Sequence, residues 1–538
     1  MMMTILRLSL RVLLPRTLLP LLLFSCFGVA ARAQSPKLPA PDKIVGEYIK
    51  AVGGKSRVAG LRDVTYEWAV LREGKESGTA RTHLMTTGAL RTDFLLADGE
   101  WDAAANSRTA WLRARDGRLS TLTDREAFAA RLQAMLEAAY FADYKKQKIL
   151  ARTVGREEVA GGLAYAVEFT TRAGARLRYW FDAQSKLLLQ SADEARGTRV
   201  SYADWRARAG SPLKVEPHRI EFERAGEPVL TLTLTSASYN TGLADSFFEP
   251  PADATLDIPA LLRDLSKNQE ETDRRINDYT FTRKVTEREL DDKGVLKKEK
   301  VTVYEVYPFV GYGWVQKLVS ENGVPLTPER EAKELKRVAE ELEKAEREAP
   351  KRTEKRERRR AERRAKRQAK ATKTGGTEDD EDEDDVGIST FLRACEFVSP
   401  RRERFRERDV IVFDFRPRAG FKPSNSGESL VSKLSGVIWV DPAERQVMRL
   451  EARLVDSFKM GGGLLASIKP GSAFLFEQTR LAEGVWLPRY SQVNASARVM
   501  LFKGLSVNET NEFGDFKRFS TKSGEHKLDE PKKETPEP

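Results

Sequence analysis

The sequence predicts an α+β protein with two related, β-rich halves in tandem. Three observations predict it. Many short runs alternate apolar and polar residues with the period of two that marks half-buried strands, and Gly or Asp clusters separate them as hairpin turns would. A few longer segments have the helical period instead. The order of helices and strands in the first half also recurs in the second.

The N-terminus has the pattern of a secretory signal peptide over residues 1–33. Arg7, Arg11 and Arg16 precede an uncharged run over 17–31, and an A-x-A cleavage site ends at Ala33. The strongly apolar part is shorter than the ~20 residues that span a bilayer. We therefore expect cleavage after Ala33 and a periplasmic or outer-membrane-associated protein, with lipidation at Cys26 as the alternative fate.

In the first half we expect a helix over 42–52 that ends at a Gly-Gly pair, followed by an antiparallel meander and a second helix over 125–144. More strands follow that helix. The strands expected in this half are 64–70, 79–86, 90–96, 108–114, 118–123, 163–171, 175–182, 186–192, 198–205, 218–224 and 228–238.

The second half begins with an expected helix over 258–276. Strands are expected at 278–288, 298–307 and 312–320, then a long helix that starts at Pro328, and further strands from about 408.

Local residues also match between the halves. Three pairs of segments occur in the same order: 167–174 with 413–420, Trp180-Phe181-Asp182 with Trp439-Val440-Asp441, and Pro217-His218-Arg219 with Pro488-Arg489-Tyr490. Their common order favours duplication of one unit. We expect a first domain at 34–257 and a second at 258–522, with a charged helical or disordered insertion at 327–387 and a disordered tail at 523–538.

The net charge of +11 does not indicate a nucleic-acid partner. Residues 351–373 hold 13 basic and 3 acidic side chains, and 378–385 hold 8 acidic ones, so these two tracts nearly cancel. Anionic lipid or cell wall suits an exported, mildly basic chain better. The charged tracts at 351–385 allow two interpretations, a polybasic arm for such a partner or a solvated, self-neutralising segment.

The sequence offers no recognisable catalytic or metal-binding set. After cleavage only Cys395 remains, and the three histidines lie far apart, so we expect no disulfide, no metal and no cofactor. There is no G-x-S-x-G elbow and no H-E-x-x-H helix. Asp182 and Asp441, which occupy equivalent repeat positions, are interpreted as turn residues. We therefore expect a protein that is not an enzyme.

Several short motifs carry a family resemblance. They are Ala51-Val52-Gly53-Gly54-Lys55, Tyr179-Trp180-Phe181-Asp182, Asp245-Ser246-Phe247-Phe248, Lys433-Leu434-Ser435-Gly436, Lys459-Met460-Gly461-Gly462-Gly463 and Leu501-Phe502-Lys503-Gly504. With them the chain resembles the LolA/LolB-like outer-membrane lipoprotein-sorting proteins, as two tandem LolA-like domains of the kind found in acidobacterial envelope proteins. The resemblance implies curved antiparallel sheets, each an incompletely closed barrel whose concave apolar face is covered by helices.

Such a shape could hold a lipid or a lipoprotein acyl chain, since sixteen carbons in water cost about 13 kcal/mol at ~0.8 kcal/mol per methylene. Trp68, Trp111, Phe169 and Trp180 are candidates for that hydrophobic face, or alternatively for an ordinary core. The leading hypothesis is therefore a lipid or acyl-chain carrier. The alternatives are an envelope-stress sensing module with a membrane-protein partner and a structural protein that binds the cell wall.

Overall fold

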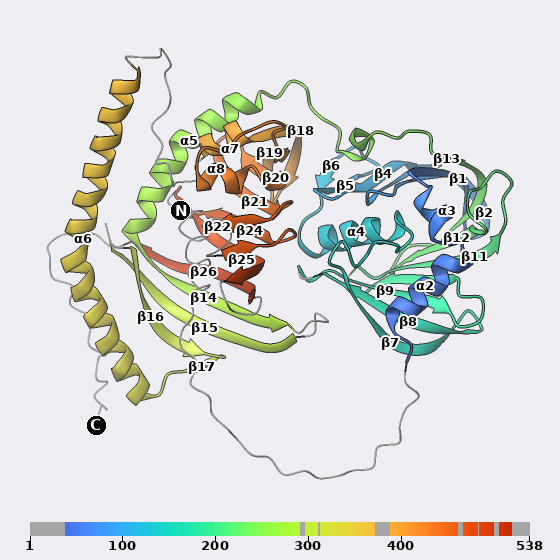
Figure 1. The fold of residues 1–538 in the computed structure, drawn as a ribbon, viewed down its shortest axis with the longest axis horizontal. Coiled ribbons are helices and arrows are strands. Elements are labelled where there is room, and N and C mark those ends of the chain that lie inside the picture. The colour runs from blue at the N-terminus through green and yellow to red at the C-terminus, as the bar shows by residue number, and fades with distance from the viewer. Residues whose placement is uncertain are drawn as a thin grey trace, which may run out of the picture.

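The computed structural model describes residues 38–171, 173–194, 196–290, 296–309, 313–371, 388–460, 466–482, 484–499 and 505–518. The expected signal peptide, the acidic tract at 378–385 and the expected tail lie outside the described residues. Two large antiparallel sheets dominate the structure, one in the first half and one in the second (Figure 1).

The first sheet has thirteen strands in the order β6-β5-β4-β3-β2-β1-β13-β12-β11-β10-β9-β8-β7. Their bounds are β1 (Asp63–Arg72), β2 (Lys75–Met85), β3 (Ala89–Leu96), β4 (Gly99–Ala105), β5 (Ala110–Arg113), β6 (Leu119–Thr121), β7 (Leu150–Val159), β8 (Gly162–Thr170), β9 (Arg176–Asp182), β10 (Leu188–Asp193), β11 (Thr198–Arg206), β12 (Glu216–Arg224) and β13 (Leu230–Tyr239). The edge strands β6 and β7 are not neighbours, so the sheet is open.

The expected elements differ from this sheet in three places. β4 was not expected, because three of its seven residues are alanines, which have low β propensity. β7 is an edge strand that buries none of its residues, so it lacks the apolar alternation of an inner strand. The helix expected over 125–144 was too long: it ends at Glu137, and the backbone at Tyr140 and Phe141 has positive φ angles of 49° and 61°.

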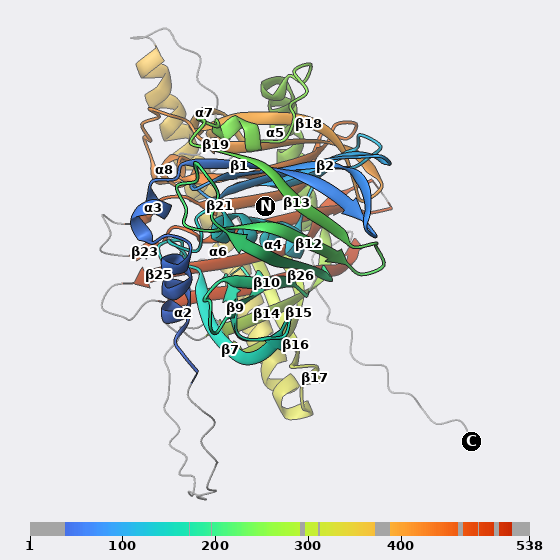
Figure 2. The ribbon, with the colours of Figure 1, turned by 90° about the vertical axis from the view of Figure 1, so that its right-hand side faces the viewer.

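Three helices accompany the first sheet: α2 (Pro41–Ala51), α3 (Lys55–Ala59) and α4 (Asp124–Glu137). α2 and α3 lie at one end of the strands, in front of the second half in Figure 2. The core joins apolar residues of α2 and α4, such as Tyr48 and Leu132, to aromatic residues of the strands. Phe141 contacts Tyr48, Phe169 and Tyr179 edge-on or tilted, with ring centroids 4.9–5.6 Å apart. The inner face of this sheet is therefore packed with aromatic side chains.

The second sheet is also open and antiparallel, in the order β17-β16-β15-β14-β26-β25-β24-β21-β20-β19-β18, with β22 and β23 attached beside β25. Its strands are β14 (Tyr279–Leu290), β15 (Leu296–Phe309), β16 (Gly313–Glu321), β17 (Val324–Pro325), β18 (Cys395–Phe405), β19 (Arg408–Pro417), β20 (Leu434–Asp441), β21 (Gln446–Leu454), β22 (Phe458–Met460), β23 (Ala466–Ile468), β24 (Ala473–Arg480), β25 (Trp486–Val499) and β26 (Leu505–Arg518). The predicted fold class, two open curved sheets with helices, is confirmed.

The two sheets have the same plan. In each, the first strand pairs with the last, β1 with β13 and β14 with β26. The repeated segments lie on equivalent strands: 167–170 is on β8 and 413–416 is on β19, each next to an edge strand. Asp182 and Asp441 both accept two backbone N–H bonds in the turn that follows their strand, which confirms them as turn residues.

The helices of the second half are α5 (Ile258–Arg275), α6 (Pro328–Ala371), α7 (Ile388–Ala394) and α8 (Ser426–Val431). α5, α7 and α8 pack on one face of the sheet, over β19, β20 and β21. α6 rests on β16 through Val338, Ala345 and Val315 and stands at the outer side of this half (Figure 1). It continues through Pro350, so the basic tract up to residue 371 is helical. No helix in the described ranges is both long and apolar enough to cross a membrane.

Candidate functional site

The four aromatic residues predicted from the sequence are all buried, with at most 5% of their surface exposed. Trp68 and Phe169 lie in the same core cluster, while Trp180 packs with three alanines in a separate one. Trp111 donates its indole N–H to the carbonyl of Phe248 at 3.1 Å. The structure thus brings only two of the four into one cluster, and the ligand face that they were expected to form stays a prediction.

A second candidate site lies where the two halves meet. One face of the second sheet is turned toward the first half. In β21, apolar and charged residues alternate between this face and the core face. Leu450 and Ala452 point into the core under the helices. The alternate residues Arg449, Glu451 and Arg453 therefore point to the opposite face, because side chains alternate along a strand. In Figure 1 α4 stands against this face.

One ion cluster joins β18 and β19 to β6. The side chain of Arg401 is 2% exposed and contacts Glu403 at 2.7 Å and Asp414 at 3.0 Å. It also donates to the Thr121 hydroxyl at 2.6 Å, while Glu403 accepts the Thr121 backbone N–H at 2.7 Å. Asp414 is fully buried, and its second oxygen lies 3.5 Å from Arg108 of the first half. These paired charges bind the two halves together.

A second cluster centres on Arg449, whose side chain is 1% exposed. It contacts Glu451 at 2.6 Å and Asp124, the first residue of α4, at 2.9 Å, and it also pairs with Glu477. Burial acts to lower the pKa of Arg449, but the three carboxylates outweigh it and raise that pKa above its ordinary value. Arg449 is thus a fully neutralised cation at the interface.

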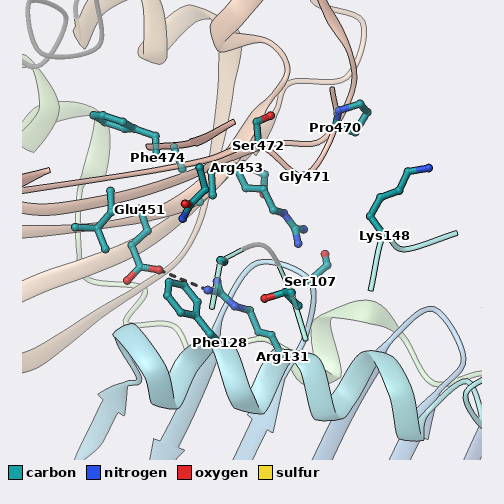
Figure 3. Close-up of a pocket in the computed structure, with 18 of the residues that line it drawn as sticks. Ser107, Phe128, Arg131, Lys148, Glu451, Arg453, Pro470, Gly471, Ser472 and Phe474 are labelled. Atoms are coloured by element: carbon teal, nitrogen blue, oxygen red, sulfur yellow. Dashed lines mark ion pairs between the residues drawn. The ribbon is translucent and has the colours of Figure 1, made fainter. Parts of the chain in front are cut away.

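Beside these clusters a cavity of about 380 Å³ opens between the halves. Figure 3 shows Phe128 and Arg131 coming from α4 on one side, and Glu451, Arg453 and Phe474 coming from the second sheet on the other. The apolar side chains in its wall are Phe128 and Met135 from α4, and Ala473 and Leu475 from β24, which pair with Arg453 and Glu451 and share their face of the sheet. A volume of this size lies within the range of small-molecule sites, and such sites are mostly apolar with a few polar groups.

The charged part of the cavity is mainly basic. The charged lining residues are Arg108, Arg131, Lys148, Glu451, Arg453 and Lys469. Burial lowers the pKa of Arg131, and Glu451, 3.8 Å away, opposes that shift. Burial, together with the positive charges of Arg131 and Arg108, lowers the pKa of Arg453 to about 10. Because arginine side chains stay protonated in proteins, both are cations, and the cavity is an apolar pocket with a cationic side.

The residues that line this cavity are suited to binding a ligand.

Outside the cavity, burial raises the pKa of the Cys395 thiol to about 12, which leaves it protonated and unreactive. His83 lies between Thr65, at 2.9 Å, and Asp93, at 3.1 Å. Within the described ranges, no group of three His, Cys, Asp or Glu residues is placed to hold a metal ion.

Sequence reasoning missed this site. Its signal was the alternation of charge in Arg449-Leu450-Glu451-Ala452-Arg453 and of Arg401 with Glu403, since an inner strand with charges on one face needs a partner for that face. The strand β18 was itself not expected, because its run of arginines and glutamates resembles a solvated loop. Those charges are buried only because the first half covers them.

Comparison with known proteins gives matches in structure only. No family model and no curated protein matches the chain. It is similar to a LolA superfamily protein from Nitrosomonas europaea, at 12% identity and a TM-score of 0.28, over 41% of this chain and 100% of that one. It is also similar to a putative outer membrane lipoprotein-sorting protein domain from Vibrio parahaemolyticus, at 12% identity and a TM-score of 0.27, over 38% of this chain and 96% of that one.

The MucA/MucB complex of Pseudomonas aeruginosa gives 9% identity and a TM-score of 0.17, over 87% of this chain and 94% of that one. The solved structures that the chain is similar to thus include LolA-like lipoprotein-sorting proteins, the family that its sequence resembles, at low identity and low TM-scores. None of the three is described as an enzyme.

Proposed function

We propose that this protein is a non-enzymatic carrier or binding protein of the cell envelope whose ligand is a lipid or a lipoprotein acyl chain, held in the cavity between its two halves. The observation that carries the proposal is that cavity, about 380 Å³ in volume, with Phe128, Met135 and Leu475 in its wall and basic side chains beside them. Each methylene buried against such a wall gains ~0.8 kcal/mol. Eight methylenes therefore gain about 6 kcal/mol before the costs of association.

The proposal also takes the chain to be exported through its N-terminal segment 1–33 and divided into domains at 34–257 and 258–522. The buried ion clusters of Arg401 and Arg449 support joint action of the two halves, because both clusters draw on residues of each half. A ligand in the cavity would contact both halves at once.

Native mass spectrometry of the protein purified from envelope fractions tests the proposal, with a fluorescent fatty acid as the probe in solution. Ala473→Trp places a bulky ring on β24, where Ala473 pairs with Arg453 and shares its face of the sheet. The matched control is Ala203→Trp, at an exposed position of β11. We expect co-purified lipid in the wild type and the control, and at least a tenfold loss of fatty-acid binding in Ala473→Trp only.

Three results would contradict the carrier function as proposed. Equal binding by all three proteins would place the ligand outside the cavity. Protein free of lipid that does not bind the fatty acid, but crosslinks stably to a membrane protein, would favour the sensing module. Recovery on peptidoglycan without lipid binding would favour the cell-wall alternative.

A further inference from the structure

We propose that the cavity recognises an acidic group, a carboxylate or a phosphate monoester, and that Arg453 is the side chain that binds it. This inference rests on the proposed function and deepens it by naming the chemistry of the ligand's head. The ligand that fits is an anionic amphiphile, with its tail on the apolar wall and its charged end on Arg453.

The other arginines near Arg453 at the interface are paired with carboxylates. The neighbouring arginines each have a carboxylate within 4 Å; they are Arg401, Arg449, Arg108 and Arg131. Within the part of the chain that the structure describes, Arg453 forms no ion pair and its side chain donates no hydrogen bond. A cation in this position lacks the partner that partly buried charges usually have, so an anion that enters the cavity would supply it.

Among the described residues that line the cavity, Glu451 alone is acidic, and both of its carboxylate oxygens already face arginines. Its Oε1 accepts from Arg449 at 2.6 and 3.0 Å, and its Oε2 faces Arg131 at 3.8 Å. The charges that act on Arg453 are those of Arg131 and Arg108, which are positive and, with burial, lower its pKa to about 10. The local field around Arg453 therefore favours an incoming anion and disfavours a cation.

Two buried amides line the same cavity, Gln147 from the first half and Asn494 from β25 of the second. The side-chain oxygens of Gln147 and Asn494 are buried without a hydrogen-bond partner. An amide that flips about its last side-chain bond exchanges its oxygen and nitrogen without a change of shape, so each can present an N–H donor instead. With the planar guanidinium of Arg453, which can bind two oxygens at once, these amides complete a set of donors for a carboxylate or phosphate.

The apolar part of the cavity wall favours a ligand with an apolar tail. Phe128 and Met135 on α4 and Leu475 on β24 line the same cavity as Arg453. Two further lining residues, Lys148 and Lys469, add positive charge to the cavity and attract anions toward it. A neutral amphiphile would use the wall alone, and free phosphate would use Arg453 alone.

The test uses the full mature chain and four probes: dodecanoate, dodecyl phosphate, 1-dodecanol and inorganic phosphate. Titration calorimetry would compare the wild type with Arg453→Gln and with the control Arg219→Gln, an exposed arginine of β12. We expect the wild type and the control to bind the two acidic amphiphiles at least about tenfold more tightly than 1-dodecanol, as a charge-assisted hydrogen bond predicts. Arg453→Gln should lose that preference and keep its affinity for 1-dodecanol.

The outcomes separate this inference from the proposed function. If Arg453→Gln keeps the preference for acidic amphiphiles, or if the wild type has none while still binding 1-dodecanol, the anion site is wrong and the carrier function stands. If inorganic phosphate alone binds, and does so through Arg453, the anion site stands and the lipid function is wrong. If none of the four probes binds, both proposals are wrong. Thermal unfolding confirms that each variant is folded, because Arg453 forms no ion pair whose loss would destabilise the described structure.

Discussion

Replacing Arg401 by methionine should show how much the buried ion cluster at the interface contributes to the free energy of unfolding. The side chain of Arg401 is 2% exposed, and its partners Glu403 and Asp414 are 2% and 0% exposed. Methionine fills a similar volume but leaves two buried carboxylates with fewer donors. Breaking a buried pair in this way costs about 3–5 kcal/mol. Since a domain is stable by about 5–15 kcal/mol, this loss is a large fraction of the total.

Urea unfolding followed by tryptophan fluorescence measures the loss, with Arg404→Met as the matched control on the same strand. Arg404 is 60% exposed and its ion pairs lie at the surface, so its replacement should change the free energy of unfolding by less than about 0.5 kcal/mol. Burial already raises the pKa of Asp414, and Arg401 opposes that shift. Without Arg401 the folded protein takes up a proton more readily, so the deficit should shrink as the pH falls and grow as it rises.

The reasoning would be refuted if Arg401→Met and Arg404→Met had indistinguishable free energies of unfolding at pH 7. A deficit that stayed constant between pH 7 and pH 4 would refute its electrostatic origin. In that case the cost would come from packing and not from the unpaired carboxylates.

Three further substitutions test other features. Burial raises the pKa of Glu137 to about 7, against the hydrogen bonds that it accepts from Tyr179 and Tyr202. The free energy of unfolding should therefore fall by about 3 kcal/mol as the pH rises from about 4.5 to 8. Glu137→Gln should remove that fall, and an unchanged pH profile in the variant would contradict this. In Gly436→Ala the new Cβ would overlap the carbonyl of Glu451 and lie 2.8 Å from Phe415. Chemical denaturation should therefore show a free energy of unfolding lower by about 1–3 kcal/mol. The control Gly46→Ala, in open space on α2, should raise it by up to about 1 kcal/mol. Arg453→Met should stabilise the ligand-free protein by about 1 kcal/mol, because it removes the repulsion of Arg453 by Arg131 and Arg108. Thermal unfolding measures the change. A loss of stability would contradict this and would mean that Arg453 makes a stabilising ion pair.

The sequence could predict the class of the fold because its signals are local. Alternation in Val64-Thr65-Tyr66-Glu67-Trp68 reports a strand whichever strand it pairs with, and the helix start at Pro328 depends only on its own turn. β18 could not be predicted in the same way. Arg401 and Glu403 have the composition of a loop, and they become inner-face residues only when β6 of the first half covers them.

The candidate site was beyond local signals for the same reason. Its walls come from α4 in the first half of the chain and from β21 and β24 in the second, and no motif connects them. The aromatic residues that the sequence favoured, such as Trp68 and Phe169, are core residues of the first half. Aromatic content marks buried surface in general, and it does not distinguish a core from a ligand face.

The pairing of the first strand with the last in each sheet has a consequence for how the chain folds. β1 cannot find its β13 neighbour, nor β14 its β26 neighbour, until the whole of the corresponding half has become available. Such distant pairings slow folding and leave strand edges open in the meantime. In each half the sheet is therefore complete only when its last strand has paired. A truncation that removes β13 should prevent β1 from folding correctly, and one that removes β26 should do the same to β14, although both strands lie far from the cut in the sequence.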